Sequence, residues 1–100
     1  MTKKQKTKTV GPYCVIRTRS AGVHVGIVAQ RNGLEVLLHE ARRIWSWQGA
    51  NTLHEIALRG VAEGSRVSDQ VATILLTEVI EIIPATAEGE ANLRAAGWTK

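Results

Sequence analysis

The chain has 100 residues, of which 44% are hydrophobic and 22% are charged. This balance is typical of a single globular domain and excludes an intrinsically disordered chain. No stretch has the roughly 18 consecutive apolar residues of a membrane span, and the first residues do not resemble a signal peptide. The single cysteine, Cys14, excludes a disulfide framework and a four-cysteine metal site, and is typical of a reducing cytoplasm.

The formal net charge of +4 arises in the first ten residues, because the rest of the chain contains nine basic and nine acidic residues. We predict a basic N-terminal arm over residues 1–11 and a single domain over residues 12–100. The arm is either simply solvated or contacts nucleic acid or a partner protein. Its charge comes from four lysines, Lys3, Lys4, Lys6 and Lys8.

Residues 13–38 alternate hydrophobic and polar side chains with the period of two that is typical of β-strands. A turn is expected at Ser20-Ala21-Gly22. Asn32-Gly33 predicts a tight hairpin, because a type I′ turn needs positive φ at both central residues. These signals predict a three-stranded antiparallel meander.

The segment 41–49 fits either a strand or a helix. As a strand it places Arg43, Trp45 and Trp47 on one face, and as a helix it places Arg43 beside Trp47. The β-prone sequence Ile-Trp-Ser-Trp and the glycine that follows favour the strand, over about 42–47.

A short helix is predicted at about 53–59. Thr52 and Glu55 have the spacing of a capping box, in which Thr52 accepts from the amide of residue 55 and Glu55 reaches back. Gly60 is a suitable residue for the C-terminal end of this helix. Residues 62–70 are expected to form a polar loop.

Residues 71–83 are rich in β-branched side chains and are followed by Pro84. This stretch is long for one strand, so it is expected to bend or to split near Thr77-Glu78. Its nearly continuous apolar character predicts a central place in the sheet, with both faces buried for part of its length. The expected core residues are Val71, Ile74, Leu76, Val79, Ile80 and Ile82.

Residues 86–96 predict a weak C-terminal helix that ends at Gly97, with Trp98 packing back onto its last turn. The expected fold class is therefore α+β. It consists of a small antiparallel β-meander, extended by strands near 42–47 and 71–83 into a partly open, barrel-like sheet, with one short helix and one weak C-terminal helix.

Nothing in the sequence indicates a metal site, a cofactor or catalysis. His24, His39 and His54 each stand alone, without the converging spacing of zinc ligands. There is no Walker loop and no GxGxxG motif. Cys14, His24 and an acid would make a nucleophilic triad, but Cys14 lies in a predicted strand among apolar residues, where free cysteine usually packs as a small hydrophobe.

The most unusual stretch is 42–47, in which two arginines adjoin two tryptophans. Guanidinium groups bind phosphate and indoles stack on bases, so this composition suits a phosphate-bearing ligand. Alternatively, the tryptophans are core anchors in a chain without phenylalanine, or they form a protein interface. The candidate ligand-binding residues are Arg43, Trp45 and Trp47, followed by Arg42 and His24.

His24 lies between Gly22 and Gly26, and two interpretations stay open for it. It is either a titratable hydrogen-bond donor beside glycines that allow close approach of a ligand, or a solvent-facing strand residue. The second interpretation is favoured.

Several segments resemble a family of small tailed-phage and prophage proteins. They are SAGVHVG at 20–26, ARRIW at 41–45 with Trp47, and ILLTEVIEII at 74–83. The resemblance covers most of residues 13–83. It implies a place of action in the cytoplasm of an infected bacterium or in a phage particle, and it carries over no catalytic or binding residue.

The expected function is that of a non-catalytic, phage-encoded accessory protein that binds a nucleotide signal or nucleic acid. The first alternative is a structural virion accessory or an inhibitor of a host protein, acting through the basic arm and an exposed sheet face. The second alternative is a small hydrolase. Self-association is also expected, and no contact with a membrane.

Overall fold

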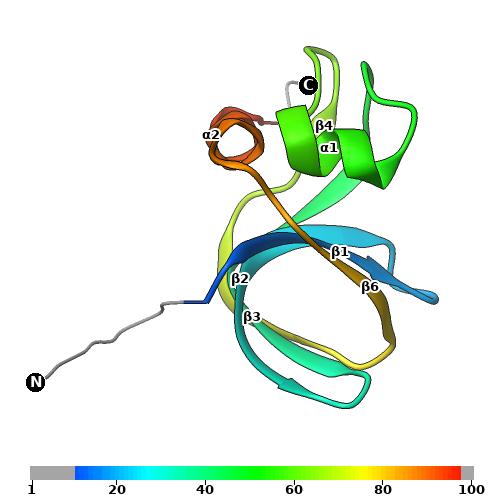
Figure 1. The fold of residues 1–100 in the computed structure, drawn as a ribbon. Coiled ribbons are helices and arrows are strands. Elements are labelled where there is room, and N and C mark those ends of the chain that lie inside the picture. Colours follow the sequence, from blue (N-terminus) through cyan, green and yellow to red (C-terminus); the bar gives the residue numbers. More distant parts are fainter. Residues whose placement is uncertain (1–10, 98–100) are drawn as a thin grey trace, which may run out of the picture.

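The computed structural model describes residues 11–97, which form a strongly curled antiparallel sheet with two helices above one end (Figure 1). The predicted basic arm and Trp98 lie outside these residues. The elements follow in chain order as β1 (Tyr13–Thr18), β2 (Val23–Asn32), β3 (Glu35–Ser46), α1 (Leu53–Arg59), β4 (Arg66–Val67), β5 (Val71–Leu76), β6 (Val79–Pro84) and α2 (Ala87–Ala95).

The sheet has six strands in the order β4-β3-β2-β1-β6, and β5 pairs with another part of β3. Strand β3 can serve two neighbours because it is long: Leu37 lies opposite Leu75 of β5, and Ile44 lies opposite Val67 of β4. Within the part that pairs with β5, between His39 and Ala41, Glu40 has φ of 53°, a left-handed conformation that is uncommon for a residue other than glycine. The α+β class and the antiparallel meander are confirmed.

Both faces of the sheet are buried along β1. Alternate side chains of β1 point to opposite faces, so Val15 packs under the helices and Ile16 packs inside the curl. We call the first cluster the helix-side core and the second the inner core. The helix-side core comprises Tyr13, Val15, Val25, Ile27, Ile44, Ile56, Ala57, Val61, Val67 and Leu93. The inner core comprises Cys14, Ile16, Val36, Leu38, Ala41, Leu76 and Val79.

The predicted helix at 53–59 is confirmed, with the Oγ1 atom of Thr52 accepting from the amide of Glu55 at 3.3 Å. Gly60 ends the helix with φ of 85°. The return half of the capping box is shifted by one residue, because the carboxylate of Glu55 accepts from the amide of Asn51 at 3.0 Å.

The C-terminal helix α2 is also present, and it packs against α1. The side-chain amide of Asn92 bonds both backbone groups of Val61: its Oδ1 atom accepts from the N–H at 2.8 Å and its Nδ2 atom donates to the carbonyl at 3.0 Å. Gly89 lies so close to α1 that a Cβ atom there would be 2.2 Å from the carbonyl oxygen of Ala57.

The region 71–83 differs from its prediction in position. It splits at Thr77 and Glu78 as expected, but β5 and β6 lie at edges of the sheet and not at its centre. Leu76 and Val79 are buried beside the split. The other four predicted core residues are only partly buried (Ile74 and Ile82) or about half exposed (Val71 and Ile80).

Two further elements have boundaries that differ from their predictions. The predicted strand at 42–47 is the second half of β3 and not a separate strand, and the predicted loop at 62–70 contains the two-residue strand β4. Among the residues described, no helix is both long and apolar enough to cross a membrane.

Candidate functional site

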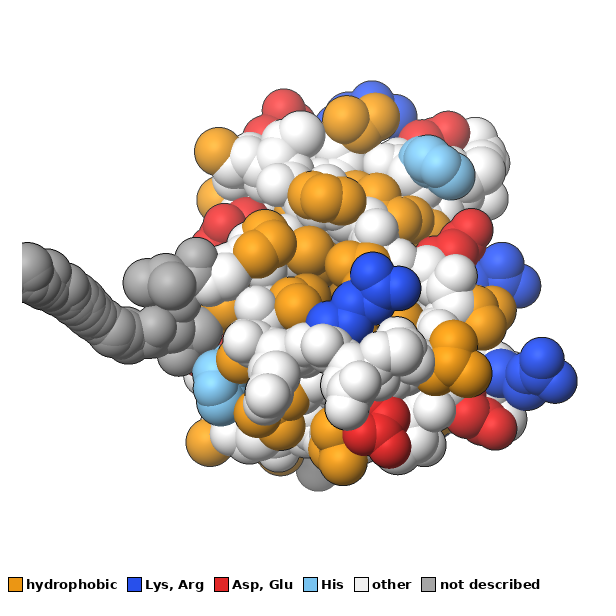
Figure 2. Space-filling model, turned by 60° about the horizontal axis from the view of Figure 1, so that its bottom comes forward, with side chains coloured by type: hydrophobic (Ala, Val, Ile, Leu, Met, Phe, Trp, Pro, Cys, Tyr) orange, Lys and Arg blue, Asp and Glu red, His pale blue; other side chains and the backbone are white. Residues whose placement is uncertain are grey.

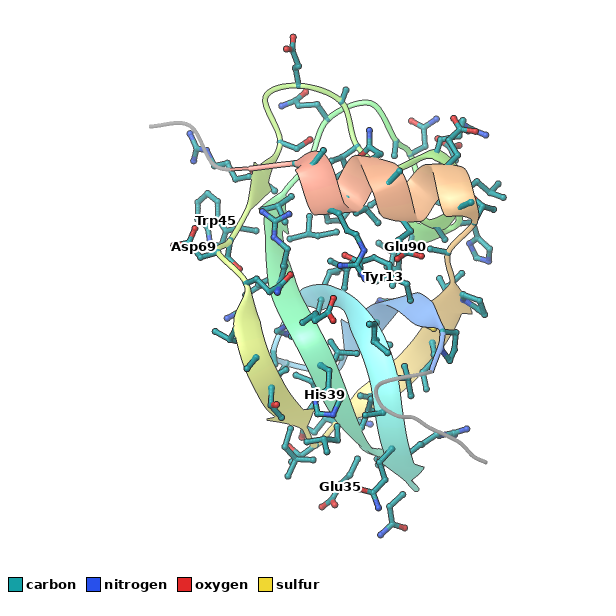
Figure 3. All side chains as sticks on the ribbon, turned by 90° about the vertical axis from the view of Figure 1, so that its left-hand side faces the viewer. Tyr13, Glu35, His39, Trp45, Asp69 and Glu90 are labelled. Carbon is teal, nitrogen blue, oxygen red and sulfur yellow. The ribbon has the colours of Figure 1, made fainter. Side chains whose placement is uncertain are left out.

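Trp45 is the most exposed aromatic side chain among residues 11–97, with 59% of its surface accessible. It extends from the second half of β3, where β4 pairs with that strand. The guanidinium carbon of Arg66, on β4, lies 5.4 Å from the centre of the indole ring, which is the geometry of a cation–π contact. Figure 3 shows Trp45 on the same margin of the sheet as Asp69.

Arg43 is exposed two residues before Trp45 on the same strand. Its backbone N–H donates to the Oγ atom of Ser68 at 2.9 Å. The guanidinium lies against Gly22, where a Cβ atom would be 3.1 Å from one of its nitrogens. No carboxylate within residues 11–97 forms a salt bridge with Arg43, so its charge is available to an anion.

Trp47 has a different environment from Trp45. It is partly buried against the helix-side core, and its indole N–H donates to the carbonyl oxygen of Ala50 at 3.2 Å. The pairing of β3 with β4 shifts register between Ile44 and Ser46. The prediction that both tryptophans share one face with Arg43 is therefore wrong for Trp47, which is a core anchor, as the alternative interpretation held.

The side chain of Arg42 has a structural role, because its guanidinium is hydrogen-bonded to the backbone. Its guanidinium donates to the backbone carbonyl oxygen of Ser68, directly after β4, at 2.8 Å and to that of Leu93, in the last turn of α2, at 2.7 Å. Carbonyl groups at the C-terminal end of a helix have no hydrogen-bond donor within the helix, and the guanidinium of Arg42 donates to them. The further acceptors are Val67, Arg94 and Ala96. Its donors are therefore committed to the backbone.

His24 is buried, with 3% of its surface accessible, and not solvent-facing as expected. Its Nε2 atom lies 2.9 Å from the carbonyl oxygen of Ala21, within the turn between β1 and β2. Burial lowers the pKa of His24, the nearby charge of Arg43 lowers the pKa further, and the hydrogen bond to Ala21 opposes both effects. His24 lies opposite Arg43 in the sheet, and its ring is held by the turn at Ala21.

The structure places Arg66 against Trp45, and Arg43 is exposed two residues before Trp45 on the same strand. We call these three residues the Arg–Trp surface. Arg66 was not predicted, because it falls in the segment expected to be a loop. Its only sequence signal is the β-branched Val67 that follows it. A cavity of about 300 Å³ at the end of α2 includes none of the three residues in its lining. The Arg–Trp surface is open at Trp45, whose side chain is 59% exposed.

Metal-binding groups do not gather in the part of the chain that the structure describes. Residues 11–97 contain no cluster of three or more histidine, cysteine or acidic side chains that could hold a metal ion. Cys14 is buried in the inner core, and burial raises the pKa of its thiol. A raised pKa makes the reactive thiolate scarcer at neutral pH.

These features define the class of the molecule: a small α+β domain whose exposed aromatic and basic side chains lie on one margin of a curled sheet. A family model matches residues 11–93, and the chain belongs to that family, which is described as a domain of unknown function (DUF6948). The matched region includes all three residues of the Arg–Trp surface. No curated protein and no solved structure matches the chain.

Proposed function

We propose that this protein is a non-catalytic binding module that engages a phosphate-bearing ligand, a nucleic acid or a nucleotide, through the Arg–Trp surface. The observation that carries the proposal is the exposed indole of Trp45 with the guanidinium of Arg66 against it and Arg43 on the same strand. An exposed indole offers a base a stacking partner, and guanidinium groups donate to phosphate oxygens.

The open shape of the surface favours single-stranded nucleic acid over a free nucleotide. Pockets for small ligands usually bury most of the ligand's surface, whereas a stacking platform for single strands stays accessible along its length. The four lysines of residues 1–10 would add attraction to the phosphate backbone.

The setting that we propose is a phage or prophage, on the basis of the resemblance at 20–26, 41–47 and 74–83. The protein would then act in the cytoplasm of an infected bacterium or in a phage particle. Native mass spectrometry of the protein purified from infected cells tests this setting, because it reports any retained ligand together with the stoichiometry.

A second candidate function is that of an interaction protein, either a virion accessory or an inhibitor of a host protein. The observation that favours it is the hydrophobic exposure below the helices, where hydrophobic side chains gather across the middle of one face (Figure 2). The large hydrophobic side chains that are exposed outside the Arg–Trp surface include those of Leu34, Leu75 and Ile80.

The experiment that separates these functions is fluorescence anisotropy with labelled single-stranded DNA and RNA, with duplex DNA and nucleotides as competitors. Stacking on an aromatic side chain is worth about 1–3 kcal/mol per base, so Trp45→Ala should weaken binding by roughly 5- to 150-fold. Leu58→Ala is the matched control, because Leu58 is an exposed hydrophobic residue on α1. Equal binding by the two variants, or no binding by the wild type, would contradict the proposal.

A further inference from the structure

The outer edge of β5 has no partner among residues 11–97. Strand β5 pairs with β3 on one side, and it does not pair with β6, although only Thr77 and Glu78 separate the two strands. Figure 3 shows β5 beside β3 at the outer margin of the sheet. An unpaired edge presents a row of backbone N–H and C=O groups to whatever strand approaches it.

This edge lacks the features by which proteins usually protect an exposed strand. Residues 70–77 contain no charged residue, no proline and no glycine. The other free edge differs, because β6 carries Glu81 and ends at Pro84, which has no N–H to donate. The composition of β5 therefore indicates an edge that is covered in the working protein.

The side chains of β5 show which surface would be covered with the edge. Ile74 and Leu76 point into the inner core, so by the alternation of a strand Val71, Thr73 and Leu75 lie on the opposite face. Val71 is 50% exposed and Leu75 is 54% exposed.

We propose that a second copy of this chain covers this edge, by antiparallel pairing of β5 with β5 of the partner about a two-fold axis at Thr73. Residues 70–77 carry no charge that would attract a strand of opposite charge from another protein. When two copies of this strand pair, no like charges lie opposite one another. The nearest acidic residues, Asp69 and Glu78, flank the paired stretch, and neither lies opposite its own copy in this register.

The two faces of the strand restrict the axis to the position of a residue, and the exposed apolar side chains of Val71 and Leu75 then select Thr73. To keep the inner cores of both copies on the same side of the joined sheet, residues that lie opposite one another must come from the same face. An axis at Thr73 meets this condition and places Val71 opposite the partner's Leu75, twice by symmetry, with Thr73 opposite itself. Apolar and threonine pairs of this kind stabilise neighbouring strands, and a two-fold axis closes the assembly as a dimer.

The test is the mass in solution of the full chain, measured by sedimentation from micromolar to millimolar concentration. The wild type should form dimers, and Val71→Lys and Leu75→Glu should each give monomers. The double variant should recover the dimer, because each Lys at 71 then faces a Glu at 75 in the partner. Ile80→Lys is the matched control, because Ile80 is similarly exposed but lies on β6, and it should leave the dimer intact.

A second measurement tests the register without removing any apolar contact. In the Thr73→Cys variant, mild oxidation should join two copies by a disulfide, because Cβ atoms of directly opposite residues lie only about 4.5–5.5 Å apart. Circular dichroism verifies that every variant is folded. A wild type that is monomeric throughout would overturn the proposal and leave the edge to another occupant. A dimer that Ile80→Lys breaks and Val71→Lys does not would also overturn it.

Discussion

The Nη1 atom of Arg42 donates a hydrogen bond to the carbonyl oxygen of Leu93 at 2.7 Å, and this contact joins the middle of β3 to the last turn of α2. The two residues are far apart in the chain, and the same guanidinium also donates to the backbone of Val67 in β4 and of Ser68 directly after it. One side chain thus fastens the C-terminal helix and the shortest strand onto the sheet.

Replacing Arg42 should therefore destabilise the fold. Arg42→Ala leaves several carbonyl groups without their donor, and each buried group that loses its partner costs about 1–3 kcal/mol. Arg42→Lys should recover only part of this loss, because an ammonium group cannot reproduce the planar fork. Urea titration measures the free energy of unfolding. Arg43→Lys is the control and should change this free energy by less than about 0.5 kcal/mol, as expected for a surface position.

Replacing Trp47 should lower the stability of the fold much more than replacing Trp45. Trp47→Ala removes a ring that packs against the helix-side core and should cost about 3 kcal/mol of unfolding free energy. Trp45→Ala removes an exposed ring and its contact with Arg66, and should cost about 1 kcal/mol or less. Thermal melting of both variants, beside the wild type, tests this difference. An early melt of the Trp45 variant would show that its ring belongs to the scaffold.

Stability should fall in mildly acidic solution because of His24. In the unfolded chain this side chain takes up a proton near its ordinary pKa of about 6.5, whereas burial keeps its pKa lower in the folded protein. The unfolded state therefore binds more protons as the pH drops below about 6.5, and the unfolding free energy decreases until the folded histidine is also protonated.

The measurement is urea titration at pH 7.5 and at pH 5.5 for the wild type and for His24→Asn. Both proteins retain His39 and His54, so the difference between their pH dependences reports His24 alone. The wild type should lose more stability over this interval than the variant. Parallel losses would contradict the assignment of the effect to His24.

Gly89→Ala should destabilise the protein although alanine is the better helix former. A glycine inside a helix costs about 1 kcal/mol relative to alanine, but here the added Cβ atom would lie 2.2 Å from the carbonyl oxygen of Ala57, which is backbone and cannot move aside. We expect a net loss of about 2 kcal/mol, as for overpacked sites. Gly97→Ala is the control, because no atom of residues 11–95 lies within 4 Å of a Cβ atom there.

The sequence predicts best the features that depend on neighbouring residues. The cap at Thr52 and the helix end at Gly60 follow from capping rules, and the structure contains both. The predicted hairpin is also present, but its turn lies one residue later, at Gly33-Leu34: Asn32 still pairs with Glu35, and Gly33 has positive φ whereas Asn32 does not, so the predicted type I′ turn at Asn32-Gly33 is wrong. The split at Thr77-Glu78 follows from strand length. Each of these depends on the backbone preferences of a few adjacent residues, so tertiary packing does not alter them.

The sequence predicts less well the features that depend on strand pairing. The apolar run at 71–83 does not distinguish a central strand from two edge strands of a curled sheet, because either arrangement buries apolar side chains from both faces of the run. The separation of Trp45 from Trp47 accompanies a register shift between β3 and β4. Arg66 becomes part of the candidate site only through that pairing, since two residues are too few to give a periodic signal.

The position of β1 has a consequence for how the chain matures on the ribosome. Strand β1 lies between β2, which follows it directly, and β6, and the pairing with β6 is followed by a backbone hydrogen bond from the amide of Ala85 to the carbonyl oxygen of Tyr13 at 2.8 Å. During synthesis, one edge of β1 therefore stays open until nearly the whole domain has left the exit tunnel. Pairing between distant segments forms slowly and leaves apolar edges exposed meanwhile. A chain whose synthesis stalls before residue 79 would therefore expose an unpaired edge of β1 and be prone to aggregation.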